Sequence, residues 1–190
     1  EFNGNDKRRM EIIFDETSRL ERILDEMLNF AKPIRVNLDP ISIHGIIDSC
    51  FEIVDVKMKE KGIRVKKRYG RDMPDILLDH DRIEQAVINV ILNSVEALQA
   101  GGEITIITKH DAKDKKGIIQ IEILDNGPGI SPDDLPYVFD PFFSNKKKGT
   151  GLGLSNVKKI MEAHGGTART EARKPRGTRV VLTMPARNTV

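Results

Sequence analysis

A stripe of polar side chains marks one predicted helix of this sequence. Between residues 81 and 98 apolar residues fill most positions, and the polar residues that interrupt them recur at spacings of four, four and three. They are Gln85, Asn89, Asn93 and Glu96. At about 100° per residue these side chains stack along one line of the helix. Because carboxamides on a largely buried helix need hydrogen-bond partners or a bound ion, the stripe predicts a polar ligand site, or else a seam that faces water between two packed flanks.

A glycine-rich turn follows a predicted strand that ends near residue 124. It reads Asp125-Asn126-Gly127-Pro128-Gly129-Ile130. Its glycines allow the backbone to turn sharply and to approach a ligand closely, and the aspartate is fixed at the end of the strand. The same residues also suit an ordinary hairpin turn, so this element alone does not separate a binding loop from a hairpin.

A second glycine-rich element opens a predicted helix over residues 152–162. It reads Gly149-Thr150-Gly151-Leu152-Gly153-Leu154. Backbone amides at the positive end of a helix favour phosphate oxygens. The element is not a Walker loop, because no Gly-Lys-Ser/Thr follows it, and it is not a dinucleotide fingerprint, because a long loop and not a strand precedes it.

The long loop between the two glycine-rich elements carries aromatic and basic residues. They are Phe139, Phe142, Phe143 and the run Lys146-Lys147-Lys148. The phenylalanines either anchor a mobile loop or pack beneath an ordinary one. The lysines either neutralise a triphosphate or form a solvated charge run.

The composition limits the classes of protein to which these elements can belong. The 190 residues include 31 basic and 29 acidic side chains, a net charge of +2, and 38% of the residues are hydrophobic. This suffices for one ordinary core, and no basic stripe stands out, so we expect no nucleic-acid partner. The single cysteine, Cys50, excludes an internal disulfide and fits a reducing compartment. No stretch is long and apolar enough to span a bilayer, so we expect a cytoplasmic location without membrane contact, whether or not a parent protein is membrane-anchored.

Residues 7–32 form a predicted helix without glycine or proline, and Pro33 ends it. Its seam residues recur at spacings of four, three, four, three and four. They are Ile13, Thr17, Leu20, Leu24, Met27 and Ala31. This heptad seam predicts either a bundle or dimerisation helix whose partner is partly missing, or a surface helix that covers its own domain.

Beyond Pro33 helical and strand patterns alternate. Further helices are predicted at residues 41–60 and from Asp79 or Asp81, as the capping residue, to about residue 98. Strands are predicted at residues 63–66, 76–78, 103–108, 118–124 and 179–184. This order predicts an α/β (α+β) two-layer sandwich, in which helices pack on one face of a mixed sheet and one long helix precedes it.

In this order and at these separations, the elements resemble the nucleotide-binding domain shared by gyrase, Hsp90, histidine kinases and MutL, and most closely that of bacterial sensor histidine kinases. Residues 81–94 resemble the N box, residues 125–130 the G1 box, residues 140–143 the F box and residues 149–154 the G2 box. Gly177-Thr178 resembles the closing element before the last strand, and His164-Gly165-Gly166 its run-up. The resemblance implies that residues 1–32 are the second helix of a dimerisation hairpin and residues 33–190 an ATP-binding catalytic domain.

The resemblance also implies roles for single residues. Asn93 should ligate Mg²⁺ on the triphosphate, with Asn89 beside it. Asp125 should accept a hydrogen bond from the adenine amino group, and Gly127 and Gly129 should let the base approach the backbone.

The phosphates should be held by the backbone amides of Gly149, Gly151 and Gly153, and Lys146 should reach the terminal phosphate from a flexible lid over residues 131–148. Asn89 and Lys146 are the catalytic candidates. The implied site for ATP or ADP is completed by Glu96, Ala97, Ile130, Phe142, Thr150, Leu152, Leu154 and Thr178.

The implied activity is transfer of the γ-phosphoryl group of MgATP to a histidine on a dimerisation helix outside these residues, within a homodimer, followed by signalling to a response regulator. None of the four histidines matches that acceptor; His80 precedes Asp81, but it lies at a helix start, where capping is the ordinary role. The chain is therefore expected to bind ATP without phosphorylating itself. Gyrase-like ATPases have a glutamate that activates water at the position of Asn89, and because Asn89 cannot take up a proton, fast hydrolysis is not expected.

Two other functions are compatible with the same nucleotide site. One is a nucleotide-gated interaction module, in which ATP orders the lid and no group is transferred. The other is an anti-sigma-type serine kinase of the same superfamily, although that group lacks a hairpin helix like the one predicted at residues 7–32.

Overall fold

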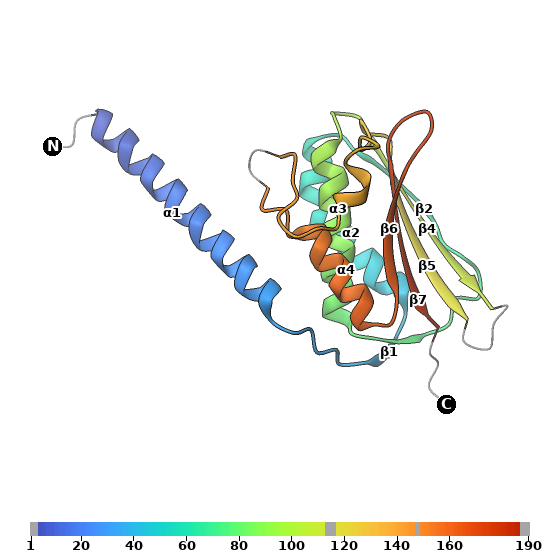
Figure 1. Ribbon diagram of the computed structural model, residues 1–190. Helices are drawn as coiled ribbons and strands as arrows, with labels where there is room; N and C mark the ends of the chain where they lie inside the picture. Colours follow the sequence, from blue (N-terminus) through green and yellow to red (C-terminus); the bar gives the residue numbers. More distant parts are fainter. Residues whose placement is uncertain (1–3, 113–116, 147–148, 187–190) are drawn as a thin grey trace.

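A long helix, α1 (Gly4–Ala31), projects from a body in which helices cover one face of a sheet (Figure 1). The computed structural model describes residues 4–112, 117–146 and 149–186. Among these residues, no helix is both long and apolar enough to cross a membrane. The arrangement confirms the predicted two-layer α/β sandwich with one long helix in front of it.

The main sheet has five strands in the order β2-β4-β5-β7-β6. They are β2 (Arg64–Arg68), β4 (Glu103–Asp111), β5 (Ile118–Asp125), β6 (Thr167–Ala172) and β7 (Thr178–Pro185). β2 pairs with β4 in parallel and the other neighbours are antiparallel, which confirms the predicted mixed sheet. β1 (Asp39–Ile41) and β3 (Ile76–Leu78) form a separate antiparallel pair.

The sequence patterns do not predict β1 or β6. β6 is an edge strand without a buried side chain, so its residues lack the apolar alternation by which a strand is recognised. β1 is only three residues long and contains Pro40. In both cases the partner strand decides the conformation, not the strand's own side chains.

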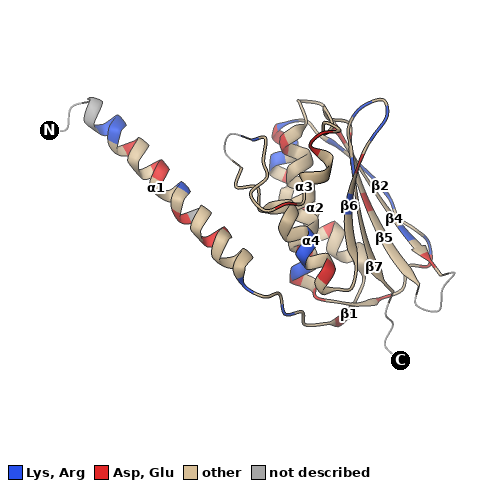
Figure 2. Ribbon diagram, viewed as in Figure 1, with Lys and Arg blue, Asp and Glu red and all other residues tan. Residues whose placement is uncertain are grey.

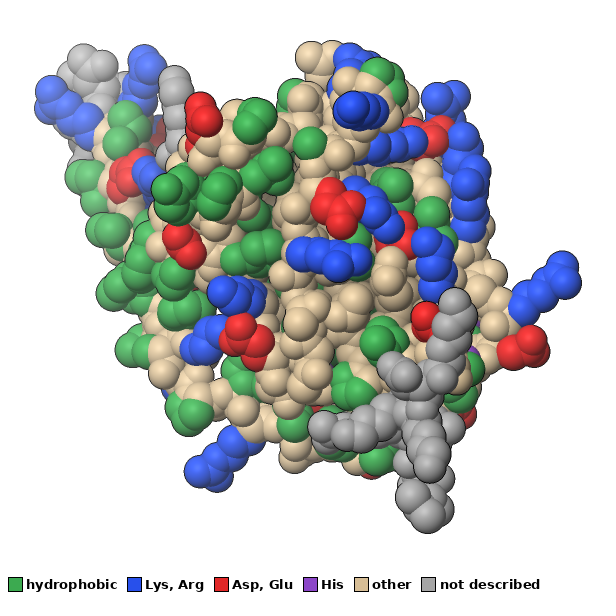
Figure 3. All heavy atoms as spheres, turned by 45° about the vertical axis from the view of Figure 1, so that its right-hand side comes forward, with side chains coloured by type: hydrophobic (Ala, Val, Ile, Leu, Met, Phe, Trp, Pro, Cys, Tyr) green, Lys and Arg blue, Asp and Glu red, His purple; other side chains and the backbone are tan. Residues whose placement is uncertain are grey.

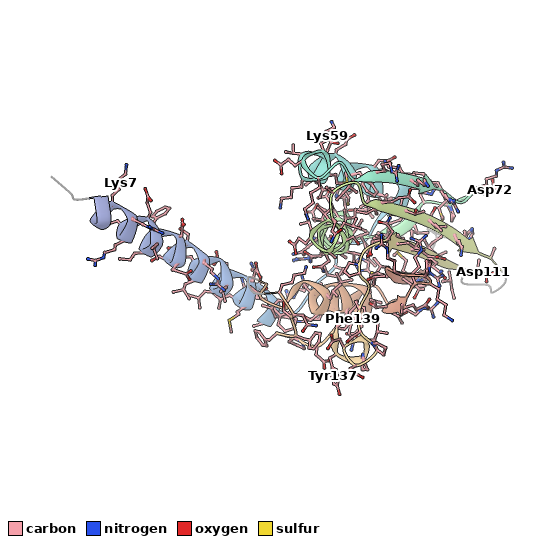
Figure 4. The ribbon with its side chains drawn as sticks, turned by 90° about the horizontal axis from the view of Figure 1, so that it is seen from above. Lys7, Lys59, Asp72, Asp111, Tyr137 and Phe139 are labelled. Carbon is pink, nitrogen blue, oxygen red and sulfur yellow. The ribbon has the colours of Figure 1, made fainter. Side chains whose placement is uncertain are left out.

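Three helices, α2 (Ile43–Glu60), α3 (His80–Ala97) and α4 (Gly153–Ala163), cover one face of the main sheet, and a short 3-10 helix, η1 (Leu135–Tyr137), lies in the loop before α4. The strands present buried isoleucines to these helices. They are Ile104, Ile106, Ile119, Ile121 and Ile123. Seen from above, α3 lies between α2 and α4 (Figure 4) and contacts both. Apolar residues of α3 therefore face two helices and the sheet, and its polar stripe occupies the remaining side.

Both ends of α3 are fixed by distant side chains. At the start, Asp79 is the N-cap: its Oδ1 accepts from the amide of Arg82 (3.1 Å), and its Oδ2 accepts from the amide of Asn37 (2.8 Å). At the end, Lys61 Nζ donates to the carbonyl oxygens of Val95 (2.7 Å) and Leu98 (3.1 Å). The helix that carries the polar stripe is thus held at its start by the segment before β1 and at its end by the residue that follows α2.

The apolar seam of α1 is exposed to solvent. Ile13 is 65% exposed, Leu20 59% and Leu24 58%, and hydrophobic side chains line the helix in the space-filling view (Figure 3). Lys7 lies at the end of α1 that points away from the body (Figure 4). The seam side chains of Ile13, Leu20 and Leu24 thus do not pack on the body, and the role of α1 stays a prediction.

The face of the sheet opposite the helices is rich in Lys and Arg (Figures 2 and 3). At its centre lies Glu122 of β5, whose side chain is only 3% exposed. Lys109 Nζ donates to Glu122 Oε1 (2.5 Å), and Arg179 Nε donates to Oε2 (2.9 Å). Burial alone would raise the pKa of Glu122, but the hydrogen bonds from Lys109 and Arg179 outweigh it, so the pKa lies below its ordinary value.

Replacing Glu122 by glutamine should lower the free energy of unfolding by about 1.5–3 kcal/mol at neutral pH, because two charged hydrogen bonds lose their carboxylate. A depressed folded-state pKa gives stability that is lost as the pH falls through that pKa, so the deficit should shrink in acid. Urea unfolding at about pH 7 and about pH 3 measures both effects. Glu171→Gln, on the exposed partner of Arg179, is the control, with an expected loss of about 0.5 kcal/mol; equal losses would contradict the central role of Glu122.

Candidate functional site

A cleft of about 710 Å³ opens beside α3. Its walls are residues of α3, the end of β5, the loop that leads to α4, the first turn of α4, the start of β7 and the end of α1. Fifteen of the predicted site residues line it. They are Asn89, Asn93, Glu96, Ala97, Asp125, Gly129, Ile130, Lys146, Gly149, Thr150, Gly151, Leu152, Gly153, Leu154 and Thr178. The fold thus brings together residues that are up to 89 positions apart, from Asn89 to Thr178.

The polar stripe of α3 faces this cleft. Gln85, Asn89, Asn93 and Glu96 all line it, while the buried residues of α3 pack into the core. The stripe therefore lies along a cleft and not on an open surface of the helix, and a polar ligand site stays a prediction. Asn89 and Asn93 are half-buried, so their carboxamides reach the cleft from a fixed helix.

Asp125 sits at the inner end of the cleft and is 3% exposed. Its Oδ1 accepts from the amides of Gly127 (2.9 Å) and Thr178 (3.2 Å). Its Oδ2 receives only the longer contact from Ser94 Oγ (3.4 Å) among the described residues. The carboxylate is therefore oriented by its neighbours, and Oδ2 is available to accept a hydrogen bond from a ligand. Gly127 does not line the cleft; it contributes by holding Asp125.

Gly177 explains why the closing Gly-Thr element lies next to Asp125. It adopts a φ of +113°, and a Cβ atom at this position would lie 2.1 Å from the carbonyl oxygen of Asp125. Only glycine lets β7 begin so close to the end of β5. Because the two strands approach so closely, the amide of Thr178 reaches the carboxylate of Asp125.

The F box meets the G2 box through a second tight contact. Gly151 has a φ of +72°, and a Cβ atom there would lie 2.4 Å from the carbonyl carbon of Phe142. Phe142 itself has a positive φ of 67° and is 58% exposed. The structure does not place Phe142 in the cleft, which is lined by Phe143 instead. A run of Asp-Pro-Phe-Phe does not reveal the positive φ at Phe142, because residues other than glycine rarely adopt one.

The start of α4 is suited to phosphate. No side chain caps this helix, whose N-cap is Leu152, and its first residues line the cleft together with the preceding glycines. Uncapped amides at a helix start attract anions. Across the cleft, Lys146 Nζ donates to Asn93 Oδ1 (2.8 Å) and lies 2.5 Å from Glu96 Oε2. The amide oxygen of Asn93 is a ligand of the hard, oxygen type that Mg²⁺ prefers, so the residues present fit the predicted metal as well as the predicted phosphates.

The end of α1 forms part of the cleft wall, which the sequence does not indicate. Glu26, Asn29 and Phe30 line the cleft. Thr150 Oγ1 donates to Glu26 Oε2 (2.5 Å), and Lys159 Nζ donates to the carbonyl oxygen of Phe30 (2.5 Å) while lying 4.2 Å from the centre of its ring. No local pattern predicts this contact, because it depends on the direction in which the chain leaves Pro33.

Two histidines are engaged in structural hydrogen bonds. Buried His164 accepts at Nε2 from the amide of Asp79 (3.1 Å) and donates from Nδ1 to the carbonyl oxygen of Ile160 (2.8 Å). His44 stacks on Tyr69 and contacts Thr108 Oγ1 (2.9 Å), and burial lowers its pKa more than nearby Asp48 raises it. Neither lines the cleft, and neither does exposed His80, next to Asp81.

The family model that describes histidine kinase-, DNA gyrase B- and HSP90-like ATPases matches residues 78–188. The chain belongs to this family. The match begins just before α3 and includes all the residues that line the cleft except those of α1.

Sensor histidine kinases are among the proteins that this chain resembles. The chain is 30% identical over 182 residues to the sensor histidine kinase ZraS of Salmonella typhi, covering 96% of this chain and 38% of that protein. It is 33% identical over 196 residues to the sensory histidine kinase/phosphatase NtrB of Rhizobium meliloti, covering 97% and 51%. The chain thus spans about two fifths to half of these relatives. The crystal structure of histidine kinase ThkA in complex with the response regulator protein TrrA matches with a TM-score of 0.79 and 26% identity, over 98% of this chain and 53% of that one.

Proposed function

We propose that this chain is the ATP-binding catalytic part of a sensor histidine kinase, which transfers the γ-phosphoryl group of MgATP to a histidine of a dimerisation hairpin. The observation that carries the proposal is that three features line the same cleft. They are the carboxylate of Asp125, which backbone amides orient, the asparagines of α3 and the uncapped start of α4. ZraS and NtrB, which the chain resembles over nearly its whole length, are named sensor histidine kinases, and this supports the assignment.

In this proposal, each wall of the cleft binds a different part of MgATP. Asp125 Oδ2 accepts from the adenine amino group, and the amides at the start of α4 hold the phosphates. Asn93 supplies an amide oxygen to Mg²⁺, with Asn89 beside it, and Lys146 contacts the terminal phosphate. When bound, Mg²⁺ neutralises charge on the triphosphate. Asn89 holds no proton-accepting group, so attack by water is slow and the phosphoryl group is kept for the histidine.

We infer two parts in the chain: residues 1–32 act as the second helix of the dimerisation hairpin, and residues 33–190 as the catalytic domain. The exposed apolar seam of α1 supports this, because an apolar stripe of that length normally packs against another helix. The partners in the proposal are the phosphoacceptor helix of a homodimer and a response regulator, as in the complex of ThkA with TrrA. The proposed location is the cytoplasm.

The proposal is tested by supplying the acceptor separately. The chain is incubated with Mg²⁺ and γ-labelled ATP, with and without a complete dimerisation hairpin, and label is followed into hairpin, chain and free phosphate. We expect acid-labile label on the hairpin, almost none on the chain and slow release of phosphate. In Asn93→Ala, transfer should fall by about 100-fold, because the metal ligand is lost.

The other outcomes identify the alternatives. Nucleotide binding without any transfer would favour a nucleotide-gated interaction module. Rapid phosphate release would move the chain toward the gyrase-like members of the family. Asn93→Ala with unchanged transfer would remove Asn93 from the metal site, provided that thermal unfolding shows an intact fold.

A further inference from the structure

The lid lysine Lys146 lies against the residue that is proposed to bind the metal. Its Nζ donates to Asn93 Oδ1 (2.8 Å) and forms an ion pair with Glu96 Oε2 (2.5 Å). Asn93 and Glu96 are neighbours on the polar stripe of α3, whereas Lys146 is 53 positions from Asn93 in the chain. The contact therefore joins the lid to α3 directly.

The remaining hydrogen bonds of this part of the lid do not reach α3. Among the described residues, the amide of Lys146 donates to Ser144 Oγ (3.1 Å), Asn145 Nδ2 donates to Asp134 Oδ2 (2.7 Å), and the amide of Gly149 donates to the carbonyl oxygen of Lys146 (3.3 Å). These contacts stay within the loop. Among the described residues, the ammonium group of Lys146 thus makes the hydrogen bonds that link this part of the lid to α3.

Contact with this ammonium group and contact with a metal ion disfavour each other at a single oxygen atom. Mg²⁺ binds oxygen at about 2.0–2.1 Å, on the same Oδ1 that the ammonium group approaches here, and two cations so close together repel each other. Glu96 balances the charge of the ammonium group through its own ion pair. Asn93 and Glu96 therefore bind the ammonium group of Lys146 as their cation in the absence of nucleotide.

We propose that Lys146 takes the place of the metal ion at Asn93 in the nucleotide-free chain, and that Glu96 is the positioning residue that holds it there. This inference rests on the proposed nucleotide site. Binding of MgATP exchanges one cation for the other: Lys146 leaves Asn93 for the phosphate oxygens, and the lid moves with it. Glu96 thus keeps the lid closed when no nucleotide is bound and lowers the affinity for MgATP.

The first test uses the chain without nucleotide. Hydrogen exchange of backbone amides in residues 142–146 and 149–151 is compared between the unmodified chain, Glu96→Gln and Glu84→Gln. Glu84 is a matched control, because it lies on the same helix but does not line the cleft. We expect exchange to be about three- to tenfold faster in Glu96→Gln only, because the lid loses its anchor. Unchanged exchange in Glu96→Gln would overturn the proposal.

The second test measures the affinity for the magnesium complex of ADP and of a non-hydrolysable ATP analogue by calorimetry. Glu96→Gln should bind about three- to tenfold more tightly than the unmodified chain, since Lys146 no longer has to be withdrawn from an ion pair. Weaker binding would overturn the proposal, because it would make Glu96 a direct support of the metal or the nucleotide.

A double-mutant cycle separates the anchor from a simple charge effect. In a Lys146→Met background, Glu96→Gln should change neither the exchange of the lid nor the affinity. Tighter binding that persists in this background would mean that Glu96 only repels phosphate, which contradicts the proposal. If the unmodified chain binds no nucleotide, the proposed function fails, and lid exchange without nucleotide still decides whether Glu96 anchors Lys146.

Discussion

Replacing Asp125 by asparagine should lower the affinity of the chain for ATP by on the order of 100-fold while the fold remains intact, since a charge-assisted hydrogen bond contributes up to about 3 kcal/mol. Oδ1 of Asp125 already accepts from the amides of Gly127 and Thr178, so the side-chain oxygen of an asparagine must take that place. Its NH₂ group then faces the ligand. A donor would replace the acceptor that the adenine amino group requires.

Two comparisons make this expectation specific. Inosine triphosphate carries an oxygen where ATP carries the amino group, so Asp125→Asn should reduce the preference for ATP over inosine triphosphate, as measured by competition with a fluorescent nucleotide. Asp133→Asn, at an exposed residue outside the cleft lining, should bind ATP like the unmodified chain. An Asp125→Asn variant that keeps both its affinity and its preference would remove Asp125 from base recognition.

Replacing Gly177 by alanine should lower the free energy of unfolding by about 3–4 kcal/mol, among the largest effects expected of a single methyl group. Its Cβ atom would lie 2.1 Å from the carbonyl oxygen of Asp125, and this oxygen belongs to the backbone of β5, which is paired on both sides. The strands must separate to admit the methyl group. Because the amide of Thr178 moves with them, nucleotide affinity should fall together with stability.

Gly101 provides the matched control. It also has a positive φ, +77°, but a Cβ atom there meets no other atom within 4 Å. Gly101→Ala should therefore lose only the conformational preference of glycine, about 1 kcal/mol, and nucleotide affinity should not change. Chemical unfolding and calorimetry on both variants measure the two effects. Equal losses of stability in Gly177→Ala and Gly101→Ala would contradict the prediction. They would show that the contact with the carbonyl oxygen of Asp125 costs nothing beyond the positive φ at Gly177.

The regular elements and most of the cleft were predictable because their signals are local. The spacing of Gln85, Asn89 and Asn93 repeats with the period of a helix, and the glycines of the two loops mark backbone conformations that other residues adopt with difficulty. The predicted strands of β4, β5 and β7 have apolar residues on the side that meets the helices. Phe142 was assigned to the site on the strength of its motif, and the structure turns its side chain out to solvent while Phe143 lines the cleft.

By itself, the sequence determined the sandwich, the order of its boxes and most of the residues that line the cleft, because helical period, strand alternation and glycine conformations are encoded within a few residues of each other. The tertiary structure alone decided that Oδ1 of Asp125 accepts the amide of Thr178, since that depends on the pairing of β5 with β7 and on the space at Gly177. It also decided that Lys146 meets Asn93 and that Glu26 meets Thr150. These contacts join residues 53 and 124 positions apart, and their geometry is set by how helices and sheet pack, which no local pattern records.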